Sequence, residues 1–255
     1  RKTDARIVGC SSAYQQHTAS LALLRRIRER RPETITMLGG PNCQGAMGAA
    51  TGTCFPWVDV VVSGEGDAVI GPLCQTLLND GVQGVSAKPL PGVWTRGRTD
   101  AQALEYAINT DLDAIPTPCY DDYFLWLDAL ELTDRVNVGI PVESSRGCWW
   151  GQRIPCSFCA SSSHGRVFRQ HAPDRLANQL KELKHRHGHQ RFTFVDSALP
   201  REDRGLLLTR LKSVTGDCNL FYEIRADVNR QDMRQLREAG VTMVQAGIEA
   251  LDTRL

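Results

Sequence analysis

The chain has 255 residues, 42% of them hydrophobic, and its 30 basic and 29 acidic side chains leave a formal net charge of +1. This composition supports one large domain or two ordinary ones, and the balanced charge excludes a strongly basic nucleic-acid surface. No apolar run approaches the ~20 residues of a membrane helix, so we predict no membrane partner and a cytoplasmic location. The chain begins with Arg1 and enters a strand almost at once, which predicts a fragment of a longer protein.

The first part of the chain alternates between predicted strands and helices. Strands are predicted at 6–12, 34–38 and 58–63, and helices at 18–31, 44–51 and 67–79. This alternation is typical of parallel βαβ units in a doubly wound α/β sheet. Residues 80–92 are rich in Gly, Pro and Ser and interrupt the pattern, and a short hairpin is predicted at 92–96. We place the first domain at residues 1–108.

Two prolines in residues 109–120 indicate a linker, and a lead-in helix is predicted at 121–131, so the linker region spans 109–135. A second alternation occupies 136–255. Its predicted strands lie at 136–144, 191–196, 219–225 and 241–247, and its helices at 174–187, 202–213 and 230–239. Asn229 is a plausible N-cap, and Gly240 stands where a glycine commonly ends a helix. Four strands and three helices predict a βα barrel that stops partway.

Nine cysteines are an odd number in a chain too long for a small disulfide scaffold, which favours a reducing compartment. Three of them, Cys148, Cys156 and Cys159, lie in the segment ESSRGCWWGQRIPCSFCA at 143–160. Thiolates are the usual ligands of iron–sulfur clusters, and three ligands would leave one iron of a cubane cluster open to substrate. The alternative is a structural zinc site with His164 as fourth ligand, in a zinc-stabilised binding module.

The end of this loop, Cys-Ser-Phe-Cys at 156–159, resembles the radical S-adenosylmethionine (SAM) cluster motif. The commonest form of that motif has three residues between the first two cysteines, whereas this chain has seven. Together with Arg146–Gly151, Gly165 and Phe168-Arg169, the loop resembles the cobalamin-dependent radical SAM proteins that mature ribosomally synthesised peptides. The resemblance implies a partial Rossmann-like cobalamin-binding domain at 1–108 and a partial (βα)6 barrel at 136–255, with the N-terminus and the C-terminal strands missing.

Many proteins of that group are C-methyltransferases. The resemblance therefore implies a [4Fe–4S] cluster on the three cysteines, SAM and cobalamin as cofactors, and an electron donor such as flavodoxin or ferredoxin. It implies methylation of an unactivated carbon of a precursor peptide through a 5′-deoxyadenosyl radical and methylcobalamin. The alternative is a cobalamin radical SAM enzyme that methylates or cyclises a small molecule or lipid. No side chain is assigned as a catalytic acid, base or nucleophile.

Contacts to SAM are implied at the ends of the predicted barrel strands. Asp196 and Ser197 resemble the pair that meets the SAM amino group, and a helix cap is the alternative role. Glu223, Arg225 and Asp227 alternate along one strand and share a face, where three charges are costly unless they bind something. The resemblance implies Arg225 for the SAM carboxylate and Glu223 for the ribose, with a structural layer of salt bridges as the alternative.

Three further residues are implied to contact cofactors in the barrel. Gly247 and Glu249 stand in a Gly-Ile-Glu stretch that resembles the family's motif after the fourth strand. Glycine lets the backbone approach a ligand, and Glu249 is the candidate contact to SAM or substrate. Phe158 is expected to pack beside the cluster or the adenine.

The first domain carries small residues at two predicted strand ends, Ser11-Ser12 and Gly39-Gly40. Open α/β sheets bind ligands beyond the carboxyl ends of their strands, and the resemblance implies that these residues leave room for the corrin and its tail. The familiar Asp-x-His-x-x-Gly cobalamin motif is not in this sequence, so no lower axial ligand is predicted. His17 is expected to start a helix rather than bind cobalt.

Overall fold

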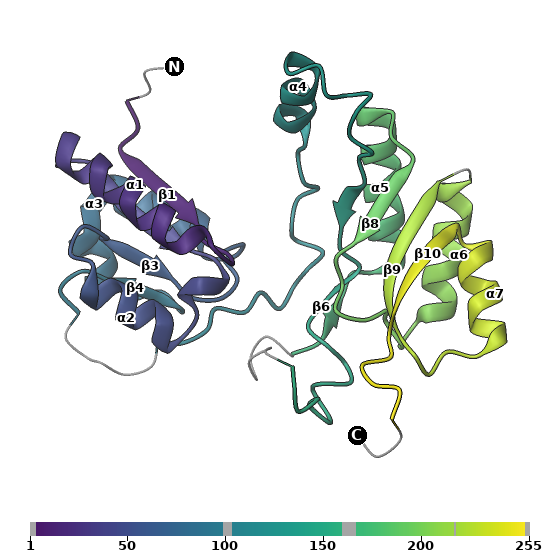
Figure 1. Cartoon of the computed structure of the whole chain (residues 1–255). Helices are drawn as coiled ribbons and strands as arrows, with labels where there is room; N and C mark the ends of the chain where they lie inside the picture. The colour runs from purple at the N-terminus through teal and green to yellow at the C-terminus, as the bar shows by residue number, and fades with distance from the viewer. Residues whose placement is uncertain (1–3, 99–103, 160–166, 217, 253–255) are drawn as a thin grey trace. The chain divides into compact units, whose positions relative to one another are not determined.

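The protein folds into two compact units, Arg1–Thr110 and Asp111–Leu255, in a computed structural model that describes residues 4–98, 104–159, 167–216 and 218–252 (Figure 1). The division between the units lies inside the stretch 109–135 that the sequence indicates as a linker. Each unit has its own sheet and its own hydrophobic core. None of the described helices is long and apolar enough to cross a membrane.

The first unit contains a four-stranded sheet. Its strands lie in the order β1 (Ile7–Ser11), β2 (Ile35–Gly39), β3 (Val60–Val62) and β4 (Val93–Thr95), and only β4 is antiparallel to its neighbour. The helical segments of this unit are α1 (Gln16–Arg30), the short η1 (Pro41–Cys43), α2 (Ala46–Cys54) and α3 (Ile70–Ala87). The predicted α/β class with parallel strands is confirmed.

Helices cover both faces of this sheet. Leu24 of α1 joins one core with Leu38 and Val61, whereas Leu73 of α3 joins another with Val60. Successive residues of β3 therefore face opposite cores, which is why this strand is an uninterrupted run of valines. The sequence pattern and the two-sided packing agree here.

The first unit differs from expectation in three ways. The described strands follow each other in chain order, so the reversal that defines a doubly wound sheet is not found among them. Helix α3 continues to Ala87 across a break at Gly81, where φ is 65°, because glycine adopts this conformation without strain. Residues 93–95 form a single edge strand paired with β3, not a hairpin.

The second unit contains a parallel sheet in the order β10-β9-β8-β5. Its strands are β5 (Ile140–Val142), β8 (Arg191–Phe194), β9 (Asn219–Arg225) and β10 (Val241–Gly247), and β5 is shorter than the predicted strand. Helix α4 (Asp121–Ala129) precedes the sheet, and α5 (Pro173–His187), α6 (Arg204–Thr215) and α7 (Arg230–Glu238) lie on one of its sides (Figure 1). A small antiparallel pair, β6 (Ser145–Arg146) and β7 (Arg169–Gln170), follows β5.

Local sequence accounts for most of these elements. Leu220, Tyr222 and Ile224 of β9 are buried against the helices, and the residues between them lie on the opposite face. Asn229 caps α7 in a capping box with Asp232, as its position predicted. The predicted limits of β9 and β10 are confirmed, since the structure starts and ends both strands at the same residues.

Candidate active site

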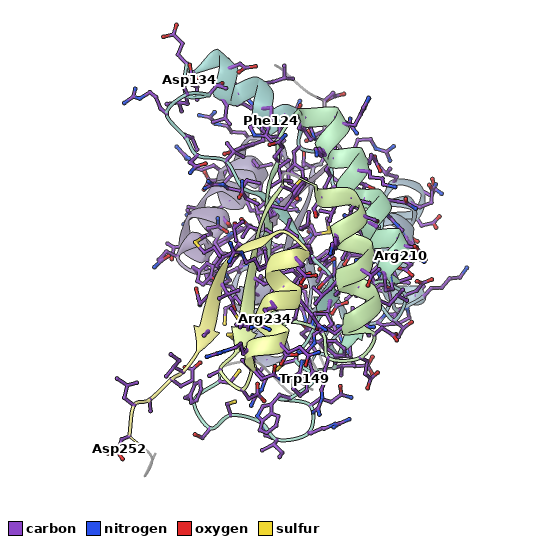
Figure 2. All side chains as sticks on the ribbon, turned by 90° about the vertical axis from the view of Figure 1, so that its right-hand side faces the viewer. Phe124, Asp134, Trp149, Arg210, Arg234 and Asp252 are labelled. Carbon is purple, nitrogen blue, oxygen red and sulfur yellow. The ribbon has the colours of Figure 1, made fainter. Side chains whose placement is uncertain are left out.

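The carboxyl ends of the parallel strands of the second unit all point to one edge of its sheet. The cysteine loop leaves this edge after β5, and the loops 195–203 and 226–229 follow β8 and β9. Figure 2 shows Trp149 of the cysteine loop at the opposite end of this unit from Phe124 of α4. In βα barrels the loops at this edge carry the chemistry.

The cysteine loop is closed at its base by the pairing of Ser145 with Gln170 and of Arg146 with Arg169. Within the loop, the backbone N–H of Gly151 points at the Cys148 sulfur, 3.3 Å away. The Cys159 N–H donates to the Cys156 carbonyl at 3.2 Å, which makes a tight turn between these two cysteines. Local hydrogen bonds therefore shape both ends of the Cys-x7-Cys-x2-Cys motif.

No disulfide joins these three cysteines; Cys148 and Cys156 are half-buried and Cys159 is exposed. The chemistry of this donor set fits an iron–sulfur cluster, because three thiols stand on one loop at the functional edge of the sheet. Among the described residues, no three His, Cys, Asp or Glu side chains gather closely enough to be identified as a metal site. The ligand assignment stays a prediction, and His164 and Gly165 lie outside the described residues.

Two tryptophans attach the cysteine loop to the neighbouring strands. The Trp149 indole N–H donates to the Leu199 carbonyl at 3.0 Å. The Arg225 guanidinium lies 3.8 Å from the ring centroid of Trp150, and Arg201 lies 5.5 Å from that of Trp149. Such cation–π contacts favour close approach of arginine and indole, so the tryptophans pack the loop against the β8 and β9 loops.

Asp196 lies directly after β8 and is only 1% exposed. Its Oδ1 accepts the backbone N–H groups of Ser144 and Ser145 at 2.8 and 2.7 Å, and its Oδ2 accepts the Ser144 hydroxyl at 2.5 Å. Burial raises the pKa of Asp196 to about 6, although these hydrogen bonds oppose the shift. The carboxylate thus holds the start of the cysteine loop, a contact that sequence reasoning did not predict.

A second group of charges fixes the loop base. Arg146 donates two hydrogen bonds of 2.8 Å to Glu143, and buried His171 contacts Glu143 and, at 2.9 Å, Asp113. Burial alone would raise the pKa of Glu143, but His171 and Arg146 outweigh it and lower this pKa to about 2. Burial would lower the pKa of His171, but the Glu143 and Asp113 carboxylates outweigh burial and raise this pKa. A local sequence pattern does not predict this group, because Asp113 and His171 lie far along the chain from Glu143 and Arg146.

The other residues predicted at the β8 and β9 ends are placed as follows. Ser197 is exposed, and Glu223 and Arg225 are half-buried on the sheet face away from the helices. The Arg225 Nε donates to Asp227 at 3.3 Å, so these two share an ion pair. Their predicted contacts with SAM stay predictions.

Gly247 and Glu249 lie close together after β10. A Cβ at Gly247 would stand 3.0 Å from the Glu249 carboxylate, and Glu249 itself has a left-handed backbone with φ of 60°. Phe158 is 65% exposed and belongs to none of the three hydrophobic core clusters. Contacts of these three residues with a cofactor also stay predictions.

In the first unit, the two strand ends meet each other rather than leaving open space. The Ser12 N–H donates to Gly39 at 2.8 Å, and a Cβ at Gly40 would lie 2.7 Å from the Ser12 carbonyl oxygen. Ser12 is fully buried, so its side chain leaves no room for a ligand. Ser11 is exposed, and Gly39 and Gly40 are both half-buried, so these three small residues stay accessible at this edge.

Both ring nitrogens of His17 have partners. Nδ1 lies 3.2 Å from the Ser12 hydroxyl, and Nε2 lies 3.4 Å from the Thr51 hydroxyl. His17 also lies in the first turn of α1, as expected from the sequence. The His17 imidazole therefore links Ser12 to Thr51 at this edge of the sheet.

The comparisons with known proteins agree with this geometry. Residues 142–255 match the Radical SAM superfamily. The chain is 24% identical over its whole length to an uncharacterized methyltransferase of Pyrococcus horikoshii, covering 54% of that protein. It is 25% identical to the hopanoid C-3 methylase of Methylococcus capsulatus, over 90% of the chain and 42% of the relative.

A further relative is the anaerobic magnesium-protoporphyrin IX monomethyl ester cyclase of Synechocystis, 25% identical over 95% of the chain and 47% of that protein. The chain thus spans about half the length of the relatives it matches. The segment that matches the superfamily begins at the last residue of β5 and includes the cysteine loop. Residues 142–255 are therefore similar to Radical SAM domains, which use a [4Fe–4S] cluster and S-adenosylmethionine.

Proposed function

We propose that this chain belongs to an enzyme that methylates an unactivated carbon by cobalamin-dependent radical SAM chemistry. The observation that carries the proposal is the three-thiol loop at the carboxyl edge of a parallel βα sheet, in the segment that matches the Radical SAM superfamily. Two relatives are named as a methyltransferase and a methylase, and they match most or all of the chain. A zinc-stabilised binding module does not account for these matches.

In this proposal Cys148, Cys156 and Cys159 hold the cluster. Arg225 meets the SAM carboxylate with the guanidinium nitrogens that Asp227 leaves available, and Glu223 meets the ribose. When bound, the cluster and SAM supply a 5′-deoxyadenosyl radical, and cobalamin supplies the methyl group. The chain's own contribution is to hold these parts in place and exclude water.

The first unit is proposed to bind cobalamin at the carboxyl edge of its parallel strands. Ser11, Gly39 and Gly40 are the exposed or half-buried small residues there. His17 is not proposed as a cobalt ligand, because both its nitrogens already have hydroxyl partners.

Two substrate classes are proposed. The proposal of a ribosomally synthesised peptide as substrate rests on the resemblance of the cysteine loop to the peptide-maturation group. A lipid or tetrapyrrole is favoured by the names of the relatives, which include a hopanoid methylase and a protoporphyrin ester cyclase. Assay of the whole protein with SAM deuterated in its methyl group separates them, because the label would enter either a peptide side chain or the small molecule.

The radical SAM assignment is tested by anaerobic reconstitution with iron and sulfide, followed by EPR of the reduced protein with and without SAM. We expect a [4Fe–4S]⁺ signal that changes when SAM is added. Cys156→Ala should lose this signal, whereas Cys54→Ala, an exposed thiol of the first unit, should keep it. A protein that takes up one zinc ion and no iron would overturn the proposal.

A further inference from the structure

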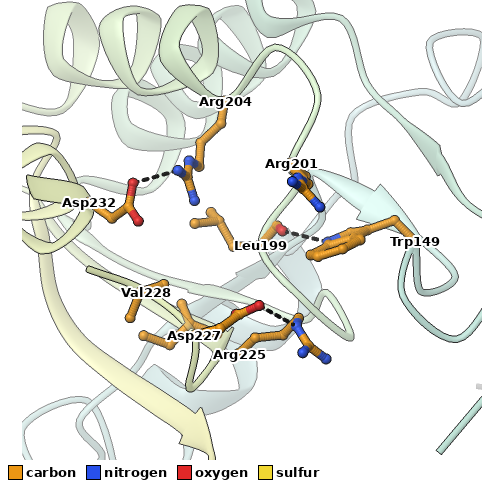
Figure 3. Close-up of a pocket in the computed structure, with 9 residues that line it drawn as sticks. Trp149, Leu199, Arg201, Arg204, Arg225, Asp227, Val228 and Asp232 are labelled. Atoms are coloured by element: carbon orange, nitrogen blue, oxygen red, sulfur yellow. Dashed lines mark hydrogen bonds and ion pairs between the residues drawn. The ribbon is translucent and has the colours of Figure 1, made fainter. Parts of the chain in front are cut away.

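A cavity of about 210 Å³ opens between the loops that follow β8 and β9, beside the cysteine loop (Figure 3). Figure 3 shows Arg201 and Arg225 on either side of Trp149 and Arg204 across the cavity from Arg225. Three arginines from separate chain positions thus surround one small space at the functional edge of the domain.

The positive charge of this cavity exceeds its negative charge. Two aspartates line it with the three arginines: Asp232 pairs with Arg204, and Asp227 pairs with Arg225. Arg201 has no carboxylate partner among the described residues, and its guanidinium lies over the Trp149 ring. A guanidinium carries five N–H donors, so donors remain available on every arginine after these contacts.

The start of α6 lies at the same cavity, because Arg204 is both its first residue and part of the lining. This helix begins at Arg204, and the side chain of its N-cap residue, Asp203, makes no capping hydrogen bond. The first N–H groups of a helix have no partner within it and carry partial positive charge. The neighbouring α7 differs, because Asn229 accepts from its first N–H groups.

The remaining lining is apolar. Leu199, Ile224 and Val228 form the part of the wall between the arginines. The volume is below the roughly 300 Å³ at which pockets begin to enclose a whole drug-sized ligand. The cavity therefore suits one end of a larger molecule, with an anionic head against the arginines and a short apolar stem against these three side chains.

We propose that this cavity binds a carboxylate or phosphate group of the substrate and so anchors the substrate beside the cysteine loop. Arg201 and Arg204 are its anion-binding residues, and Arg225 borders it on the side of the loop tryptophans. Guanidinium groups bind oxyanions through paired, charge-assisted hydrogen bonds, which gives the site direction as well as charge. The substrate assignment rests on the proposed enzymatic function, whereas the anion site itself does not.

The test is the thermal unfolding of the 255-residue chain in inorganic phosphate or in propionate, each compared with sodium chloride at equal ionic strength. A bound anion raises the unfolding temperature by mass action. Arg201→Gln should lower the affinity for the preferred anion about tenfold, the size of one lost charge-assisted contact. Arg204→Gln should do the same, and Arg135→Gln, an exposed arginine of the same unit, should leave the affinity unchanged.

Comparing inorganic phosphate with propionate shows whether the cavity prefers a phosphate or a carboxylate. Repeating the measurement in saturating SAM shows whether the bound group belongs to the substrate or to SAM. Anion stabilisation that persists in SAM supports a substrate site, and stabilisation that SAM abolishes overturns it in favour of the SAM carboxylate. Equal stabilisation of the protein and its Arg201→Gln variant overturns the site altogether. The titrations with phosphate and propionate do not need the cluster, so a failed EPR experiment would not affect the anion result.

Discussion

At the scale of single residues, Asp196 shows how burial redirects a side chain from the role its position suggests. A carboxylate at the end of a barrel strand is well placed to meet the SAM amino group. Here both of its oxygens already accept hydrogen bonds from Ser144 and Ser145, and almost none of it is exposed. Its described partners are the residues that begin the cysteine loop.

The raised pKa of Asp196 predicts a pH-dependent effect of Asp196→Asn. The unfolded carboxyl has a pKa of about 3.9 and the folded one about 6, so its contribution to stability is present below pH 4 and lost as pH rises through 6. Asparagine keeps the acceptor oxygen and carries no charge. We expect the variant to match the natural protein at pH 4 and to exceed its free energy of unfolding by on the order of 2–3 kcal/mol at pH 7.

Urea unfolding at the two pH values measures this difference. A gap between the two proteins that stays constant from pH 4 to pH 7 would show that Asp196 is not the titrating group.

Gly40 is the second residue with a sharp prediction. Its φ is 91°, and an added Cβ would meet the Ser12 backbone oxygen at 2.7 Å. Because both the conformation and the space are incompatible with a side chain, Gly40→Ala should lower the free energy of unfolding by about 2 kcal/mol or more. Gly66→Ala is the matched control, since nothing lies within 4 Å of its added Cβ, and thermal unfolding compares the two. Equal effects of both substitutions would contradict the close approach at Gly40.

At the scale of secondary-structure elements, the cysteine loop is organised from its base. The β6–β7 pair closes it, and Glu143 joins this base to Arg146 and His171. His171 in turn contacts Asp113, which lies before α4. A loop that must present three thiols is thus held by a charged group that spans three separate stretches of chain.

Glu143→Gln should weaken this base. The pKa of Glu143 is lowered to about 2 from an unfolded value of about 4.3, so its stabilisation is complete above pH 5 and is lost as pH falls through 2. We expect the variant to lose on the order of 2–3 kcal/mol of unfolding free energy at pH 7 and clearly less at pH 3. Glu238→Gln breaks an exposed pair with Lys212 and should cost no more than ~1 kcal/mol, and urea unfolding at pH 3 and pH 7 measures both variants. A loss at pH 3 as large as that at pH 7 would refute the charge argument.

At the scale of the whole molecule, two units with separate sheets and cores divide the proposed cofactors between them. The cysteines of the loop belong to the second unit, and the edge with Ser11 and Gly39 belongs to the first. Substitutions in separate cores act independently to within a few tenths of a kcal/mol. Each proposed cofactor site should therefore respond only to changes in its own unit.

Replacing Cys148, Cys156 and Cys159 together by alanine tests this independence. The triple variant should take up no iron but bind hydroxocobalamin with an affinity within about twofold of the natural chain. Titration followed by visible absorption measures the cobalamin, and iron analysis measures the cluster. Loss of both cofactors in the triple variant would show that the units are not independent in binding.

The sequence by itself determined the features that depend on neighbours along the chain. Hydrophobic periodicity located β9, β10 and the helices between the strands, and the Asn229 capping box follows from residues three apart. The resemblance of the cysteine loop to the radical SAM motif indicated the segment that the superfamily match then supported.

Only the tertiary structure decided contacts between distant stretches. Asp196 reaches Ser144 across 52 positions, Trp149 reaches Leu199 across 50, and His171 reaches Asp113 across 58. Local periodicity predicts that the end of one parallel strand lies near the ends of others. It does not predict which side chains meet there or which strands are neighbours in the sheet. For this reason the order of the first sheet, the anchoring of the cysteine loop and the three-arginine cavity could be found only in the folded chain.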